Sequence, residues 1–284
     1  MKLDAGTFLL QWAVGGLLFG WVTTRRRVVS LGYGWLIRIV FGTMAVGAVL
    51  VFLGGDGSAA RVVAAASAIA CVLAAGVALA VSVQRRGAGV RGREEVRAAR
   101  RARVSAMIGR EDEPAAEGGP EFPPALDLIA PVLGGIGLLA CAQFAGGPYL
   151  LALARLLVGA AFLGSVSDAM LLGHWYLVQP GLPRDPVKEL VGWTAVMWPF
   201  EIAVFLWPIG MIQVLNGVVD DGYHGVLGWI WAGSAIMTIG LVALTWAALR
   251  ERYYSAVMAA TGLLYLAILT AFGTDLVARA VLRP

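Results

Sequence analysis

The chain has 284 residues, of which 59% are hydrophobic and only 14% are charged, and its mean hydropathy is +0.78. Soluble domains carry about a quarter charged residues, so this composition excludes a soluble globular protein. The net charge is +4, and all but two of the 22 basic residues are arginine. The preference for arginine over lysine, together with abundant Ala and Gly, suggests a bacterial source.

Eight apolar segments are each long enough to cross roughly 30 Å of hydrocarbon as a helix. Helices are expected rather than strands, because the segments approach 20 residues and show no alternation of apolar and polar positions. The predicted fold class is therefore all-α, a polytopic integral membrane bundle of about eight transmembrane helices. In chain order the predicted spans are 6–23, 33–53, 61–83, 125–145, 149–178, 190–216, 226–248 and 255–278.

Basic residues gather in alternate loops between these spans. The other loops hold almost no basic residues apart from Arg61. By the positive-inside rule the basic loops face the cytoplasm, and both termini then lie outside a bacterial inner membrane. Arg279 and Arg283 oppose this orientation, but late charges count for less than consistent loops. The basic groups are Arg25 to Arg27, nine arginines within 85–110, Arg184 with Lys188, and Arg250 with Arg252.

Residues 84–124 form the one long polar stretch, and they divide the chain into a three-helix segment, 1–83, and a five-helix segment, 125–284. The first part of this stretch is basic, and the second, EDEPAAEGGPEFPP, is rich in acids and prolines. The basic part fits either an amphipathic helix on an anionic lipid surface or a solvated linker. Its apolar positions that roughly share a helical face are Val96, Ala99, Val104, Met107 and Ile108.

Asp168 and Glu201 lie well inside predicted spans, where a charge costs roughly 2.5–3.5 kcal/mol at the helix centre. At ~1.5 Å of rise per residue, Asp168 lies about 13 Å and Glu201 about 16 Å from the expected cytoplasmic ends of their helices. The short loop between those helices favours antiparallel neighbours at similar depth. Arg155 is expected to snorkel outward, while Arg38 could reach inward or snorkel. The pair is therefore expected to handle protons, unless each carboxyl only locks two helices together.

Aromatic residues near the same end complete the candidate site. His174 follows Asp168 by six positions, about 120° around a helix, so a direct pair is not expected, and His174 fits an interfacial belt equally well. Trp198 shares a face with Glu201 in a helix that prolines 199 and 208 are expected to kink. Together with Trp193 these side chains could wall a cleft for a quinone head, or the kink could simply improve packing.

These features favour a non-catalytic integral subunit of a bacterial inner-membrane complex of the respiratory kind. It would bind quinone, lipid or protons near the cytoplasmic side, among membrane lipids and other membrane-protein subunits. The alternatives are a proton-coupled small-molecule transporter and a membrane assembly or scaffold protein. The sequence has no Walker A, HExxH or GxSxG motif, so autonomous catalysis is not expected. No metal site and no nucleic-acid partner are expected, and haem is disfavoured because His174 and His224 fall on opposite membrane faces.

Overall fold

The computed structural model describes residues 4–86, 98, 121–179, 181–207 and 210–282. Within these ranges the regular structure is helical, and eight helices are long and apolar enough to cross a membrane, which confirms the predicted all-α membrane bundle. They are α1 (Ala5–Thr24), α2 (Leu31–Leu53), α3 (Ala59–Gln84), α5 (Leu126–Phe144), α6 (Tyr149–Val178), α7 (Asp185–Leu206), α9 (Val226–Ala248) and α10 (Tyr254–Val281); the short helix α8 (Met211–Leu215) precedes α9.

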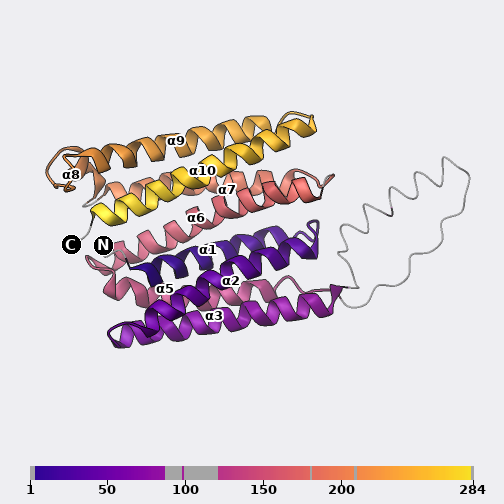
Figure 1. The fold of residues 1–284 in the computed structure, drawn as a ribbon, viewed down its shortest axis with the longest axis horizontal. Coiled ribbons are helices and arrows are strands. Elements are labelled where there is room, and N and C mark those ends of the chain that lie inside the picture. The colour runs from indigo at the N-terminus through magenta and orange to yellow at the C-terminus, as the bar shows by residue number, and fades with distance from the viewer. Residues whose placement is uncertain (1–3, 87–97, 99–120, 180, 208–209, 283–284) are drawn as a thin grey trace, which may run out of the picture.

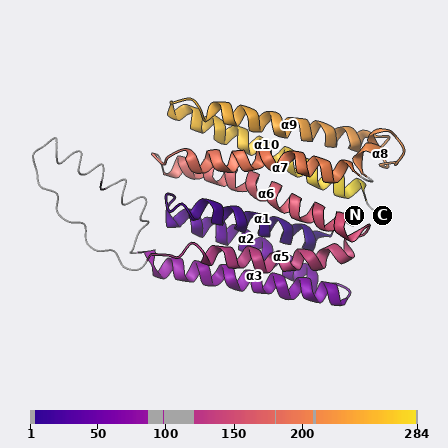
Figure 2. The same cartoon turned by 180° about the vertical axis from the view of Figure 1, so that it is seen from behind.

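The long helices form two four-helix bundles that lie side by side (Figures 1 and 2). In the first bundle α1, α2, α3 and α5 pack in a ring, each helix against the next and α5 back against α1. In the second bundle α6, α7, α9 and α10 pack in the same cyclic order. Short loops between most successive helices produce this up-and-down arrangement. Helix α5 follows residues 84–124 in the chain but packs in the first bundle. The two bundles therefore do not coincide with the predicted three-helix and five-helix segments on either side of residues 84–124. The division of the chain into domains at that stretch stays a prediction.

The two bundles are joined mainly by α1 and α6, whose backbones meet at small residues. A Cβ added at Gly15 would lie 1.8 Å from the Ala160 carbonyl oxygen, and one added at Gly164 would lie 2.2 Å from the Gly15 carbonyl carbon. Small residues spaced four apart allow this close approach in membranes, where packing rather than hydrophobic burial drives helix association. The contact leaves no room for a side chain between the two backbones at this level.

Helices α1, α3, α6 and α9 end at one end of the molecule, where the described basic loop residues follow them, and the start of α1 and the end of α10 lie at the other (Figure 1). We call these the linker end and the terminal end. The loops at the terminal end carry Asp4, Asp56, Asp220 and Asp221, and the one described Arg or Lys close to these loops and not buried is Arg61, near the start of α3. The described basic residues at the linker end are Arg25, Arg26, Arg27, Arg85, Arg86, Arg184, Lys188, Arg250 and Arg252. This segregation is what a positive-inside orientation requires, although the side on which the termini lie stays a prediction.

Some sequence predictions differ from the structure in their bounds. Helix α7 begins at Asp185, five residues before the predicted start at 190, and ends at Leu206, so that residues 211–215 form the separate helix α8. Pro199 lies inside α7, whereas Pro208 lies outside the described residues. The amphipathic helix expected in the basic part of 84–124 also falls almost wholly outside the described residues.

Candidate functional site

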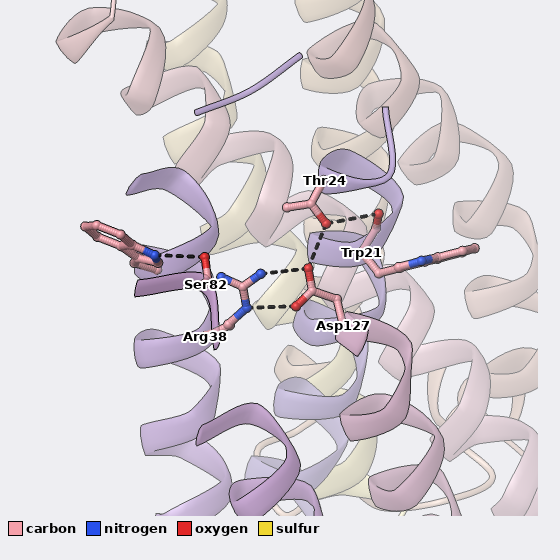
Figure 3. Close-up of polar contacts among 6 residues, drawn as sticks. Trp21, Thr24, Arg38, Ser82 and Asp127 are labelled. Carbon is pink, nitrogen blue, oxygen red and sulfur yellow. Dashed lines mark hydrogen bonds and ion pairs between the residues drawn. The ribbon is translucent and has the colours of Figure 1, made fainter. Parts of the chain in front are cut away.

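A buried ion pair joins α2 to the first turn of α5 near the linker end (Figure 3). Arg38 donates from Nε to Asp127 Oδ1 at 2.7 Å and from Nη2 to Oδ2 at 2.8 Å, and the two side chains are 4% and 8% exposed. The Thr24 hydroxyl, at the end of α1, donates to the same Oδ2 at 2.9 Å. A bidentate guanidinium–carboxylate pair is among the strongest polar contacts available to side chains. This pair therefore ties three helices of the first bundle together.

The third nitrogen of Arg38 is left over from this pair. Nη1 is buried and has no hydrogen-bond partner among the described residues. It lies against Gly34, one turn earlier in α2, where an added Cβ would come within 2.9 Å of it. A buried donor without an acceptor costs about 1–3 kcal/mol, and more when the group is charged, so proteins rarely leave one unmet. A ligand whose acceptor atom lies beside Gly34 would satisfy this donor.

Two hollows adjoin this guanidinium. The outer hollow opens at the linker end and has Ser30, Gly34 and Phe122 in its wall; its volume of about 390 Å³ includes space that is open to solvent. The inner hollow, of about 280 Å³, extends into the first bundle. Arg38, Thr24 and Gly34 belong to both, so we treat the two hollows together as the Arg38 cleft. Small and apolar residues line the inner hollow, among them Leu17, Gly20, Ala75, Ala78 and Ala130.

The mouth of the Arg38 cleft is shaped by two further contacts. Arg27 pairs with Glu121 at 2.7 Å, and its backbone takes the left-handed conformation, at φ 52°, that residues other than glycine seldom adopt. The Phe122 ring lies over the Arg38 guanidinium, and the guanidinium carbon Cζ is 4.6 Å from the centroid of the ring. The side-chain charges in the wall are therefore balanced, two cations by two carboxylates. What the cleft offers in excess is hydrogen-bond donors, because Nη1 is unmet and the Ser30 oxygen already accepts a bond from Trp175.

A second polar group lies toward the terminal end, between the two bundles. Arg279 pairs with Asp275 within α10, from Nε at 2.6 Å and from Nη2 at 2.9 Å, and Nη2 also donates to Gln11 Oε1 of α1 at 2.6 Å. Because Arg279 is only 2% exposed and paired, it does not act as a basic loop residue against the predicted orientation. We call this group the interbundle cluster; its members are Gln11, Arg155, Glu201, Asp275 and Arg279, all buried.

Arg155 of α6 and Glu201 of α7 join Asp275 and Arg279 of α10 as the second bundle's members of the interbundle cluster, and Gln11 of α1 is its member from the first bundle. Arg155 is 5% exposed, so the expectation that it snorkels to the membrane surface is wrong. Its Nε donates at 2.8 Å to the carbonyl of Val204, which lies in the last turn of α7 and lacks a helical donor. Glu201 is fully buried, neither of its oxygens has a hydrogen-bond partner among the described residues, and it lies within electrostatic reach of Asp275, Arg279 and Arg155.

Asp168 lies in different surroundings from Glu201. It is fully buried with both carboxyl oxygens unpartnered among the described residues, and its backbone carbonyl accepts a bond from the Tyr33 hydroxyl of α2 at 3.3 Å. Asp168 is ten residues from the linker end of α6 and Glu201 sixteen from the linker end of α7. These offsets correspond to depths of about 15 Å and 24 Å. The early start of α7 thus separates two carboxylates that were expected at one depth, and the carboxyl that interacts with Glu201 is that of Asp275.

The aromatic members of the predicted site are dispersed. His174 is exposed on α6, with its Nδ1 3.1 Å from the Tyr265 hydroxyl of α10. Trp193 packs edge-to-face on Phe19, and Trp198 donates to the Ala235 carbonyl of α9 at 2.9 Å. None of the three lines the Arg38 cleft.

Sequence reasoning singled out Arg38 but missed two acidic residues, Asp127, which pairs with Arg38, and Asp275, which pairs with Arg279. A signal existed for each of them. Asp127 opens an apolar segment, where an acid complements the positive end of the helix dipole. Asp275 and Arg279 stand four positions apart, the spacing at which opposite charges meet on one helix.

Comparison of the chain with protein-family models, with curated proteins and with solved structures found no match. Within the described ranges no three His, Cys, Asp or Glu side chains gather as ligands for a metal ion. The function is therefore inferred from the chemistry of the Arg38 cleft and the interbundle cluster.

Proposed function

We propose that this protein is a non-catalytic integral subunit of a bacterial inner-membrane complex that binds a quinone head in the Arg38 cleft, at the cytoplasmic side. The observation that carries the proposal is the unmet Nη1 of Arg38, a buried donor that lies against Gly34, while Asp127 holds the rest of the guanidinium and both Arg38 and Gly34 line the cleft. Redox turnover belongs, in this proposal, to partner subunits of the complex.

The charge balance of the Arg38 cleft favours a neutral ligand over an anion. Arg38 is neutralised by Asp127, and Arg27 by Glu121, so an added phosphate would meet no excess positive charge in the wall. A quinone carbonyl needs only a hydrogen-bond donor, which Nη1 supplies. Ligand sites are commonly apolar hollows with a few placed polar groups. The inner hollow continues from the guanidinium among small residues of the first bundle, which suits the start of a polyprenyl tail.

The contact between the bundles makes a transporter the weaker alternative. A transporter that alternates its access moves one helical group against another around a central site. Here Gly15 and Gly164 bring the backbones of α1 and α6 together without room for a methyl group. Parting the bundles would break this contact, whereas ligand binding in the Arg38 cleft, wholly within the first bundle and its linker end, leaves it in place.

Binding of a short-chain quinone to the purified chain tests the proposal. Trp21 lines the inner hollow, so a bound quinone should quench part of the tryptophan fluorescence in a saturable way. Gly34→Ala places a methyl group against Nη1 and should weaken binding at least tenfold. The matched control is Gly42→Ala, on the same helix, where an added Cβ meets no described atom within 4 Å and binding should not change. Alanine favours the helix over glycine, so neither variant should fail to fold.

Three results would contradict the proposal. The first is quenching that does not saturate, and the second is equal quinone affinity in Gly34→Ala and the wild type. The third is saturable binding of an anionic phospholipid that excludes quinone and is lost in Gly34→Ala, which would keep the Arg38 cleft as a site but assign it to a lipid headgroup.

A further inference from the structure

The interbundle cluster is separate from the Arg38 cleft and lies near the opposite end of the molecule. Gln11 is six residues from the start of α1, Arg155 six from the start of α6, and Asp275 six from the end of α10. Glu201 is five residues from the end of α7, so about 8 Å of helix separates it from the terminal end. Four helices thus place polar groups at one level: α6, α7 and α10 of the second bundle carry the charges, and α1 of the first bundle carries the neutral Gln11.

We propose that Glu201 is a proton-binding site that exchanges its proton with the terminal side of the membrane. The inference concerns residues that the quinone proposal does not use, so either can fail without the other.

The hydrogen bonds of the interbundle cluster single out Glu201 from its neighbour Asp275. The Asp275 carboxylate accepts two bonds from Arg279, and Gln11 Nε2 lies 3.5 Å from its Oδ1, so its negative charge is held by donors. Neither oxygen of Glu201 accepts a bond from the described residues, although the side chain is fully buried. A buried carboxylate without donors is unfavourable, and uptake of a proton removes its charge.

The guanidinium groups oppose that uptake. With every group ionised, Arg155 and Arg279 balance Glu201 and Asp275, and a proton on Glu201 leaves one positive charge in excess. The ionised and protonated forms of Glu201 are therefore each disfavoured by one effect, desolvation in the first case and loss of charge balance in the second. A carboxyl held between two such effects is one that exchanges protons rather than remaining in one form.

Among the residues that the structure describes, the titratable side chains that act on Glu201 are three. The described residues of α8 and α9 include no Asp, Glu, His, Lys, Arg, Cys or Tyr, and α1 contributes only the neutral Gln11 to the interbundle cluster. The groups that face Glu201 are Arg155 of α6 and Asp275 and Arg279 of α10. A proton in this cluster has Glu201 and Asp275 as its two carboxyl sites, and the bonds from Arg279 to Asp275 favour Glu201.

Infrared difference spectra of the full chain, recorded against pH in mild detergent, test this inference. The wild type should show a carboxylic-acid C=O band that is lost as the pH rises while a carboxylate band appears. Glu201→Gln should remove that band. The matched control is Asp168→Asn, because Asp168 is equally buried and unpartnered but lies on α6 beside Tyr33, and the titrating band should persist in it.

Arg155→Gln provides a second variant should Glu201→Gln fail to fold. Removal of one facing cation makes the ionised form less favourable, so the midpoint of the band should move to higher pH by at least one unit, a tenfold change in proton affinity. The inference is overturned by a band that is present or absent at every pH, by persistence of the titrating band in Glu201→Gln, or by an unshifted midpoint in Arg155→Gln.

Discussion

Replacement of Asp127 by alanine should be among the most damaging single changes at the linker end. It removes both acceptors of the Arg38 guanidinium and the acceptor of the Thr24 hydroxyl at once. Breaking a buried ion pair from one side costs about 3–5 kcal/mol, because the remaining charge stays buried without a partner. Both side chains are buried, so we expect a loss within that range, at least about 3 kcal/mol.

The free energy of unfolding can be measured by titrating the protein in mixed micelles with a denaturing detergent. Glu189→Ala is the control, because its partners Arg25 and Arg26 are 39% and 43% exposed, and an exposed pair contributes about 0–1 kcal/mol. The double variant Arg38→Met with Asp127→Leu leaves no buried charge and should unfold within about 1 kcal/mol of the wild type. It should nevertheless bind no quinone. A loss below about 1 kcal/mol in Asp127→Ala would refute the reasoning, since the pair would then behave like a surface contact.

Two further predictions concern the terminal end and the orientation. Burial opposes ionisation of Asp221, but bonds from backbone N–H groups, that of Gly225 foremost, outweigh it and lower the pKa of this carboxyl. A pKa lowered by folding stabilises the protein above the unfolded value, about 3.9, and the contribution is lost as pH falls through the folded pKa. Asp221→Asn should therefore lower the melting temperature at neutral pH and lose that effect in acid; an equal effect at both would contradict the assignment. In a chain with Cys71 and Cys141 replaced, an impermeant thiol reagent should label a cysteine at position 221 of intact cells and spare one at Arg184, and the reverse pattern would invert the orientation.

Helix number and the clustering of basic loops could be predicted because both depend on local properties of the sequence. A run of about 20 apolar residues specifies a spanning helix whatever packs beside it. The bounds were less predictable where polar residues continue a helix beyond the apolar run. Helix α7 starts with DPVKE, and reading its start at Leu190 instead moved the expected depth of Glu201 by five residues.

The partners of buried charges could not be predicted because they depend on which helices become neighbours. Arg155 was expected at the surface, since no acceptor for it is visible along its own helix. The structure supplies the Val204 carbonyl from α7 and the field of Glu201. Asp127 likewise meets Arg38 only because α5 returns across residues 84–124 to close the first bundle.

Buried charges in this fold divide by what surrounds them, and that division separates structural from functional roles better than depth does. Each isolated charge costs roughly 2.5–3.5 kcal/mol at a helix centre, a cost that Arg38–Asp127 and Asp275–Arg279 offset by pairing. Asp168 is acted on mainly by its own burial and by the Tyr33 hydroxyl, an arrangement that joins α6 to α2 and engages no cation. Glu201 instead faces a second carboxyl and two guanidiniums, so its charge state alters the balance of a group that spans both bundles. Of the two carboxylates that the sequence singles out, Glu201 is therefore the one whose proton has consequences beyond its own helix.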